Sequence, residues 1–134
     1  MTTGNTVGDQ MSKTLFFTGP ETTAFDAVDK MYQNKVSALL IKIDGEFKGI
    51  FTKTDWMHLT MGGQADPHKV KVGDMMSSPI ITIDRKETVG KATMIMEEKV
   101  IRHLAVTDNG KIVGMLSVKD LEKFYYKMHQ KTNF

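Results

Sequence analysis

The hydrophobic pattern of this chain occurs twice. The stretch Val7–Trp56 aligns with Val72–Leu121 without a gap, at an offset of 65 residues. In each copy the apolar positions predict the order strand, helix, strand, strand, helix. A copy of roughly 50–60 residues buries a core of its own only marginally. We therefore expect two similar units that are related by a pseudo-two-fold axis and share a core.

Apolar residues at helical spacing follow a threonine in each copy. Thr23 and Thr88 are aligned, and threonine is a favoured helix N-cap. The positions that predict the helix are Ala24, Ala27, Val28 and Met31 in the first copy, and Val89, Ala92, Thr93 and Met96 in the second. Both helices are therefore expected to begin just after the threonine.

Each copy also contains a hairpin signal between two apolar runs. Asp-Gly and Asn-Gly dipeptides supply the positive φ angles that a two-residue turn needs. The strands and turns expected are Ala38–Ile43, Asp44-Gly45 and Phe47–Phe51, then Leu104–Val106, Asn109-Gly110 and Ile112–Leu116. A short strand at Leu15–Phe17 precedes the first helix. Second helices are expected near Thr54 and Lys119, the last one reaching about His129.

The repeat gives the domain boundaries. We expect a first unit at residues 7–61, a linker at 62–71 and a second unit at 72–130. Glycine and proline in the linker mark it as a loop. The predicted fold class is α/β, with two units around a common cleft.

Composition narrows the functional classes. The chain has 134 residues, 40% hydrophobic and 25% charged, with no cysteine and a net charge of +2. No apolar run reaches the ~20 residues of a membrane span, and the N-terminus lacks a secretory signal. We therefore expect a cytoplasmic protein with no membrane partner. A charge balance this even argues against nucleic acid as a partner.

Signals for catalysis and metal binding are missing. The four histidines show no metal-ligand spacing, and no P-loop, dinucleotide fingerprint or nucleophile elbow occurs. The expectation is a protein that is not an enzyme, has no metal and requires no cofactor.

One motif closes both copies. Gly49-Ile50-Phe51-Thr52-Lys53-Thr54-Asp55 returns as Gly114-Met115-Leu116-Ser117-Val118-Lys119-Asp120. Glycine permits close approach of a ligand or backbone. The hydroxyl lies at a strand-to-helix junction, and the carboxylate lies in the first helical turn. Such a carboxylate can accept from vicinal ribose hydroxyls while the helix N-terminus attracts a phosphate. Spacing alone also fits a capping box that merely begins a helix.

The tandem copies and their ending G-h-h-[ST]-x-x-D (h, hydrophobic) resemble a pair of cystathionine-β-synthase (CBS) domains, a Bateman module. The run from Ile101 to Ser117 is similar to the family pattern, and the resemblance covers residues 7–126. It implies that Asp55 and Asp120 hold ribose hydroxyls of an adenine nucleotide, with Thr52 and Ser117 near the phosphates. It also implies that adenine lies against the first strand of each copy, at Phe16, Phe17 and Thr18, and at Ile81, Thr82 and Ile83, although plain core is the alternative for the apolar side chains.

The copies differ where phosphates are expected. Arg102 and His103 replace Ser37 and Ala38, and Lys119 replaces Thr54. Arginine offers a planar fork of donors to phosphate oxygens. One site is thus expected to be more cationic, although Arg102 and His103 fit a solvated arginine and a structural histidine equally well.

These residues predict a non-catalytic regulatory module that binds AMP, ADP or ATP and signals by a change of conformation or oligomeric state. The aromatic second helices, with Trp56, Phe124, Tyr125 and Tyr126, favour a homodimer, and a separate regulated protein would receive the signal. Three alternatives stay open: a scaffold without ligand, a binder of S-adenosylmethionine or NAD, and nucleic-acid binding through the lysines spaced four apart from Lys119 to Lys131.

Overall fold

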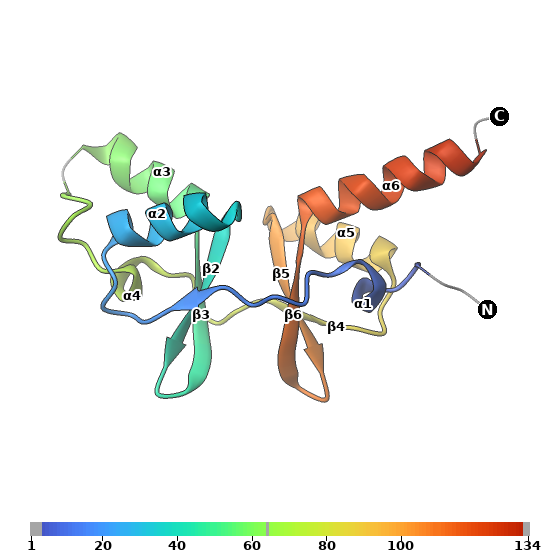
Figure 1. Ribbon diagram of the computed structural model, residues 1–134, viewed down its shortest axis with the longest axis horizontal. Helices are drawn as coiled ribbons and strands as arrows, with labels where there is room; N and C mark the ends of the chain where they lie inside the picture. The colour runs from blue at the N-terminus through green and yellow to red at the C-terminus, as the bar shows by residue number, and fades with distance from the viewer. Residues whose placement is uncertain (1–3, 64, 133–134) are drawn as a thin grey trace. The chain divides into compact units, whose positions relative to one another are not determined.

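A computed structural model describes residues 4–63 and 65–132 (Figure 1). The helices of the first half are α1 (Val7–Gln10), α2 (Ala24–Asn34) and α3 (Lys53–Gly62), and its strands are β1 (Phe17–Thr18), β2 (Ala38–Ile43) and β3 (Glu46–Thr52). The second half has helices α4 (Val72–Met75), α5 (Val89–Lys99) and α6 (Val118–Thr132), and strands β4 (Thr82–Asp84), β5 (His103–Asp108) and β6 (Lys111–Ser117). The predicted α/β class is confirmed.

The chain forms two compact units whose limits differ from those of the sequence repeats. We call Phe16–Ile80 the central unit; the terminal unit combines the segment up to Leu15 with the segment from Ile81 onward. Each repeat therefore gives its opening segment to the unit built from the other repeat. Ser12, from the first repeat, pairs with Met115 of β6, whereas Ser77, from the second repeat, pairs with Ile50 of β3.

Each unit contains one three-stranded sheet of the same topology. The orders are β1-β2-β3 and β4-β5-β6, with the first pair parallel and the second antiparallel. The hairpins turn where the sequence predicts: φ is 51° and 80° at Asp44 and Gly45, and 53° and 79° at Asn109 and Gly110. These positive angles explain why the turns contain Gly and Asp or Asn. The first strand of the central unit differs from the prediction: a strand was expected at Leu15–Phe17, whereas β1 is Phe17–Thr18.

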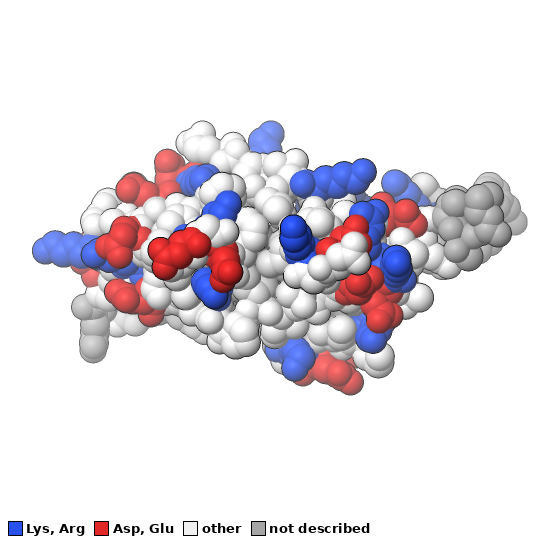
Figure 2. Space-filling view, turned by 90° about the horizontal axis from the view of Figure 1, so that it is seen from below, with Lys and Arg blue, Asp and Glu red and all other residues white. Residues whose placement is uncertain are grey.

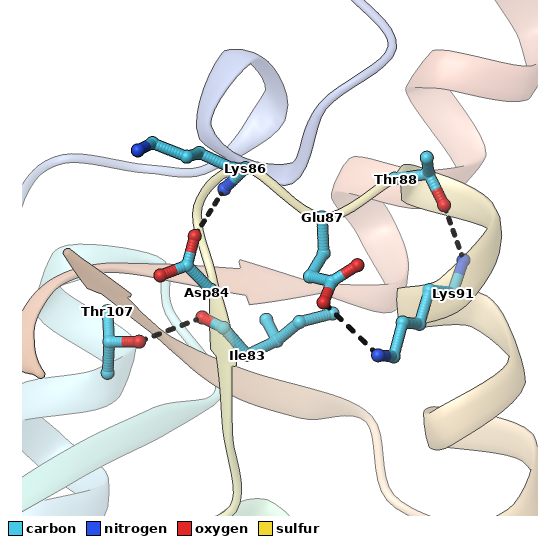
Figure 3. A network of polar contacts seen from close by, with 7 residues as sticks. All are labelled: Ile83, Asp84, Lys86, Glu87, Thr88, Lys91 and Thr107. Atoms are coloured by element: carbon cyan, nitrogen blue, oxygen red, sulfur yellow. Dashed lines mark hydrogen bonds and ion pairs between the residues drawn. The ribbon is translucent and has the colours of Figure 1, made fainter. Parts of the chain in front are cut away.

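The first helix of each unit begins as predicted. Thr23 accepts the backbone N–H of Asp26, and Thr88 accepts that of Lys91, so both threonines are N-caps. Both helices end in a left-handed residue, Lys35 with φ 56° and Val100 with φ 53°. Figure 3 shows the start of α5, where the side chains of Lys91 and Glu87 form an ion pair of 3.1 Å. The last helix, α6, extends to Thr132, beyond the predicted end at His129.

Two short helices, α1 and α4, were not predicted. Each holds a methionine against the glycine that opens the repeated motif. A Cβ added at Gly114 would lie 2.5 Å from the sulfur of Met11, and one added at Gly49 would lie 2.3 Å from the sulfur of Met76. Glycine is therefore required for packing within each unit. The atoms that approach these glycines closely are protein atoms of the same unit and not those of a ligand.

Among the described residues the buried hydrophobic side chains form two clusters, one in each unit, and each cluster contains residues of both sequence copies. The central cluster comprises Ala24, Ala27, Met31, Leu39, Ile41, Phe51, Leu59 and Val72. The terminal cluster comprises Val7, Ile83, Val89, Ala92, Met96, Leu104, Val106, Leu116 and Leu121. Val7 and Val72 lie in the cluster of the other repeat, so the exchanged segments complete both cores. This exchange explains how repeats of marginal length bury enough apolar surface.

Candidate functional site

In the central unit the motif joins β3 to α3. Thr52 is the N-cap of α3, and its backbone N–H donates to Oδ2 of Asp55 over 2.8 Å. The Thr52 hydroxyl donates to the same oxygen over 3.3 Å. Both side chains are half-buried. The aspartate is therefore held at the start of the helix by the cap interaction.

The terminal unit repeats this geometry at the start of α6. The backbone N–H of Ser117 donates to Oδ2 of Asp120 over 2.9 Å, and the Asp120 N–H donates to the Ser117 hydroxyl over 3.3 Å. These reciprocal bonds are a capping box. Within residues 4–63 and 65–132, Oδ1 of Asp120 and Oδ1 of Asp55 accept no hydrogen bond. One carboxylate oxygen caps the helix and the other stays available, so the cap and a ligand role are compatible.

A cation-bearing residue lies beside each helix start. The N–H of Val118 donates to the carbonyl of Arg102 over 3.0 Å, and the N–H of Lys53 donates to the carbonyl of Ser37 over 3.1 Å. The side chains of Arg102 and Lys119 are exposed and form no ion pair with a described acid. In the central unit the basic side chain at the helix start is that of Lys53, which lies inside the motif and aligns with Val118. The alignment of Thr54 with Lys119 did not predict it.

His103 does not add a positive charge to the terminal unit near neutral pH. Burial and, to a lesser extent, the nearby Arg102 guanidinium lower the pKa of its imidazole to about 4, and only the Asp120 carboxylate acts in the opposite direction. The expected cationic character of this site therefore depends on its other two basic residues and not on His103. Arg102 and Lys119 carry the positive charge there.

The first strand of the terminal unit presents its three predicted ligand residues differently. Thr82 is exposed and Ile81 is half-buried against the terminal cluster. Ile83 is only 4% exposed and belongs to that cluster, and its carbonyl accepts the Thr107 hydroxyl over 3.4 Å (Figure 3). The side chain of Ile83 is therefore core and is not accessible to a ligand.

The equivalent residues of the central unit also diverge. Phe16 packs against the central cluster, whereas the side chain of Phe17 is 40% exposed. The hydroxyl of Thr18 lies 2.6 Å from that of Thr22. Thr54 is exposed in the first turn of α3. The structure brings Thr52 and Asp55 together, but Phe17 contacts a different set of residues, on β2, β3 and α2.

The aromatic residues of the last helices divide between core and surface. Trp56 and Phe124 pack against the central and terminal clusters, respectively. Tyr125 and Tyr126 are 42% and 63% exposed. The exposed rings on α6 are thus available to a partner, while the other two rings stabilise their own units.

Two further properties limit the chemistry. The described residues contain no group of three or more His, Asp or Glu placed to hold a metal ion, and no described helix is long and apolar enough to cross a bilayer. Figure 2 shows acidic and basic side chains interspersed on one face of the molecule. That face lacks the single-sign surface that electrostatic nucleic-acid binding uses.

The repeats, the two sheets and the duplicated motif define a tandem pair of α/β domains. The CBS domain profile matches residues 7–62 and 72–127, so the chain belongs to the CBS domain family. An uncharacterized protein of Methanopyrus kandleri is 29% identical over 117 residues, which are 86% of this chain and 60% of that protein. The mitochondrial CBS domain-containing protein CBSX3 of Arabidopsis thaliana is 30% identical over 113 residues, 81% of this chain and 55% of that protein.

Solved structures share the fold. A CBS-domain-containing protein from Agrobacterium tumefaciens has a TM-score of 0.86 at 24% identity, covering 92% of this chain and 95% of that one. The CBS domain pair of protein MJ0100, in complex with 5-methylthioadenosine and S-adenosyl-L-methionine, has a TM-score of 0.82 at 20% identity, covering 92% and 97%. These similarities establish the tandem CBS architecture.

The chain matches only part of its longer relatives. It spans 60% and 55% of the Methanopyrus and Arabidopsis proteins. It is also 27% identical to inosine-5'-monophosphate dehydrogenase of Staphylococcus saprophyticus over 112 residues, which are 22% of the length of that enzyme. A CBS pair thus occurs joined to an enzyme, and the likeness to this chain concerns that part alone.

Proposed function

We propose that this CBS pair is a non-catalytic sensor that binds an adenine nucleotide, AMP, ADP or ATP, at the repeated motif. The ribose hydroxyls donate to the open oxygen of Asp120, and in the central unit to that of Asp55. The phosphates lie toward the helix N-termini. A nucleotide that binds two arrangements of the protein with different affinity shifts their populations and so transmits a signal.

The free Oδ1 of the capping aspartates carries this proposal. In both units Oδ2 is fixed by an N-cap bond of 2.8–2.9 Å, which orients the second oxygen without occupying it. The helix N-terminus next to it favours negative charge. A ligand with a neutral diol and an anionic group matches this pairing of acceptor and dipole.

Calorimetric titration of AMP, ADP and ATP tests the assignment. Asp120→Ala is expected to weaken binding by more than about ten-fold, since a charge-assisted hydrogen bond is lost. Asp120→Asn keeps an oxygen that can cap the helix and serves as the folding control. Equal affinity in the wild-type protein and both variants contradicts the ribose role. Asp55→Ala reports in the same way on the central unit.

Arg102 and Lys119 are proposed to contact the phosphates, and His103 to lie near them. Arg102→Gln should then weaken AMP binding while leaving adenosine binding unchanged. A phosphate beside His103 also raises the pKa of the imidazole, so AMP should bind with proton uptake near pH 5, and adenosine without it. Equal losses for AMP and adenosine contradict the phosphate contact.

A second candidate is another adenosyl ligand. The MJ0100 pair was solved with S-adenosyl-L-methionine and 5-methylthioadenosine, which carry the same ribose without phosphate. Thermal unfolding with S-adenosylmethionine, NAD and the adenine nucleotides separates these ligands, because a ligand specific for the native state raises the midpoint. A shift with S-adenosylmethionine that is insensitive to Arg102→Gln favours this second candidate.

We further propose that the signal is read through a homodimer and a separate regulated protein in the cytoplasm. Exposed Tyr125 and Tyr126 support a self-association surface, since aromatic residues are frequent interface anchors. Two CBS-CP12 structures with this fold are described as hexameric. Light scattering at micromolar concentration should give a dimer mass, and Tyr126→Glu should reduce it to that of a monomer.

A further inference from the structure

An aromatic–lysine cluster lies on the sheet of the central unit. The rings of Phe17 on β1 and Phe47 on β3 meet edge to face, with centroids 5.7 Å apart. Lys42 Nζ lies 4.8 Å from the Phe17 centroid and 5.2 Å from that of Phe47. Lys30 Nζ, from α2, lies 5.7 Å from the Phe17 centroid and donates to the Phe17 carbonyl. Four elements of the unit thus contribute to one surface.

No acidic residue that the structure describes pairs with either of the two ammonium groups. Among the described residues neither Lys30 nor Lys42 forms an ion pair, although Lys42 is half-buried. Lysine is seldom buried without a counter-charge, and cation–π contact compensates only part of the desolvation. Lys48, on the same hairpin, pairs instead with Glu46 over 2.7 Å. The cluster therefore holds a positive charge that no acidic side chain in the described part of the chain compensates.

This cluster is separate from the repeated motif. Within the central unit Thr52 pairs with Ala38, whereas Phe47 pairs with Lys42. Four residues along β2 correspond to about 13 Å, so the cluster and the motif occupy opposite ends of the hairpin. The terminal unit has no counterpart, because the aligned residues are Thr82, Ile95, Thr107 and Ile112. The site is a property of the central unit alone.

We propose that this cluster is an anion site for a phosphate monoester whose organic part is apolar. The phosphate oxygens accept from Lys42 and Lys30, and the apolar part packs on the exposed side chain of Phe17. A dianion matches two ammonium groups, and ring edges carry partial positive charge. Stacked nucleobases fit poorly because lysine lies over the ring faces.

The test is a titration of the full chain with phenyl phosphate and with inorganic phosphate, followed by the aromatic NMR signals of Phe17 and Phe47. Lys42→Met keeps the apolar stem over the rings and is expected to weaken phenyl phosphate binding about ten-fold. With Lys42→Arg the affinity for phenyl phosphate should stay within about three-fold of the wild-type value. The matched control Lys48→Met should change that affinity by less than about two-fold. Thermal unfolding verifies that each variant is folded.

The two probes separate the sources of the phosphate. Tighter binding of phenyl phosphate than of inorganic phosphate, lost in Phe17→Leu, supports an organic phosphate ester. Equal binding of both probes supports free phosphate and overturns the apolar part of the proposal. Equal effects of Lys42→Met and Lys48→Met, or no shift at either ring, overturn the site. If the ring shifts are lost in Asp55→Ala, the phosphate binds at the repeated motif and the proposed cluster site is overturned. This conclusion does not depend on whether the protein binds adenine nucleotides.

Discussion

The central and terminal units share one backbone plan and differ in the side chains that stand on it. Register, hairpin turns, threonine caps and capping aspartates recur in both. The terminal unit adds Arg102 and His103 beside its motif, whereas the central unit places Lys42 and Phe17 at the far end of its hairpin. Duplication thus preserved the groups that build the fold, while charge diverged at separate places.

The largest effect is expected at the glycines that open the motif. At Gly114 an added Cβ meets the Ser12 carbonyl oxygen at 2.7 Å as well as the Met11 side chain, whereas at Gly49 the three nearest atoms all belong to the Met76 side chain. Backbone cannot move aside as a flexible side chain can. Gly114→Ala should therefore reduce the free energy of unfolding by about 3 kcal/mol, and Gly49→Ala by about 1 kcal/mol, in urea denaturation.

Gly62 provides the control for these alanine substitutions. It lies at the end of α3 and an added Cβ has no neighbour within 4 Å. Gly62→Ala should leave stability unchanged or raise it by up to about 1 kcal/mol, because alanine favours the helix. Equal losses at Gly114 and Gly49 contradict the difference between backbone and side-chain contact.

The next effect concerns pH and only the terminal unit. The pKa of His103 falls from 6.5 to about 4 on folding, so the unfolded chain takes up a proton first as the pH decreases. Protonation of His103 in the unfolded chain costs the folded protein no stability well above pH 6.5. The free energy of unfolding decreases as the pH falls from there toward 4. Between pH 7.5 and pH 5 the free energy of unfolding should decrease by about 2 kcal/mol from this residue.

Urea denaturation of the wild-type protein and His103→Asn at both pH values isolates this contribution from that of the carboxylates. Ala38 occupies the aligned position in the central unit, so no equivalent titration is expected there. A pH dependence that is the same in His103→Asn contradicts the assignment to His103.

The smallest effect is expected where the first helices end. Val100 is left-handed, β-branched and 88% exposed, whereas the aligned Lys35 adopts the same φ without a branched Cβ. Val100→Gly should raise the free energy of unfolding by about 1 kcal/mol, and Lys35→Gly by less, in thermal unfolding. A lower midpoint for Val100→Gly contradicts the claim of strain and points to a packing role for this valine.

Sequence reasoning predicted the local features well and the long-range ones poorly. Thr23, Thr88 and the two hairpin turns follow from local hydrogen bonding and backbone sterics, so their residue types are diagnostic. The helices α1 and α4 were missed, since four residues are too few for a helical period to show. The cluster around Lys42 was also missed, because its members come from four elements and no spacing along the chain relates them.

The sequence by itself determined the duplication, the α/β order of elements and the motif with its capping aspartates. Periodicity, turn residues and caps act over a few positions, so they are legible in a single chain. Only the tertiary structure decided that the opening segments are exchanged between the units, that one oxygen of Asp120 caps the helix while the other stays open, and that His103 is neutral. Each of these depends on which atoms meet across distant parts of the chain and on how far they are withdrawn from water.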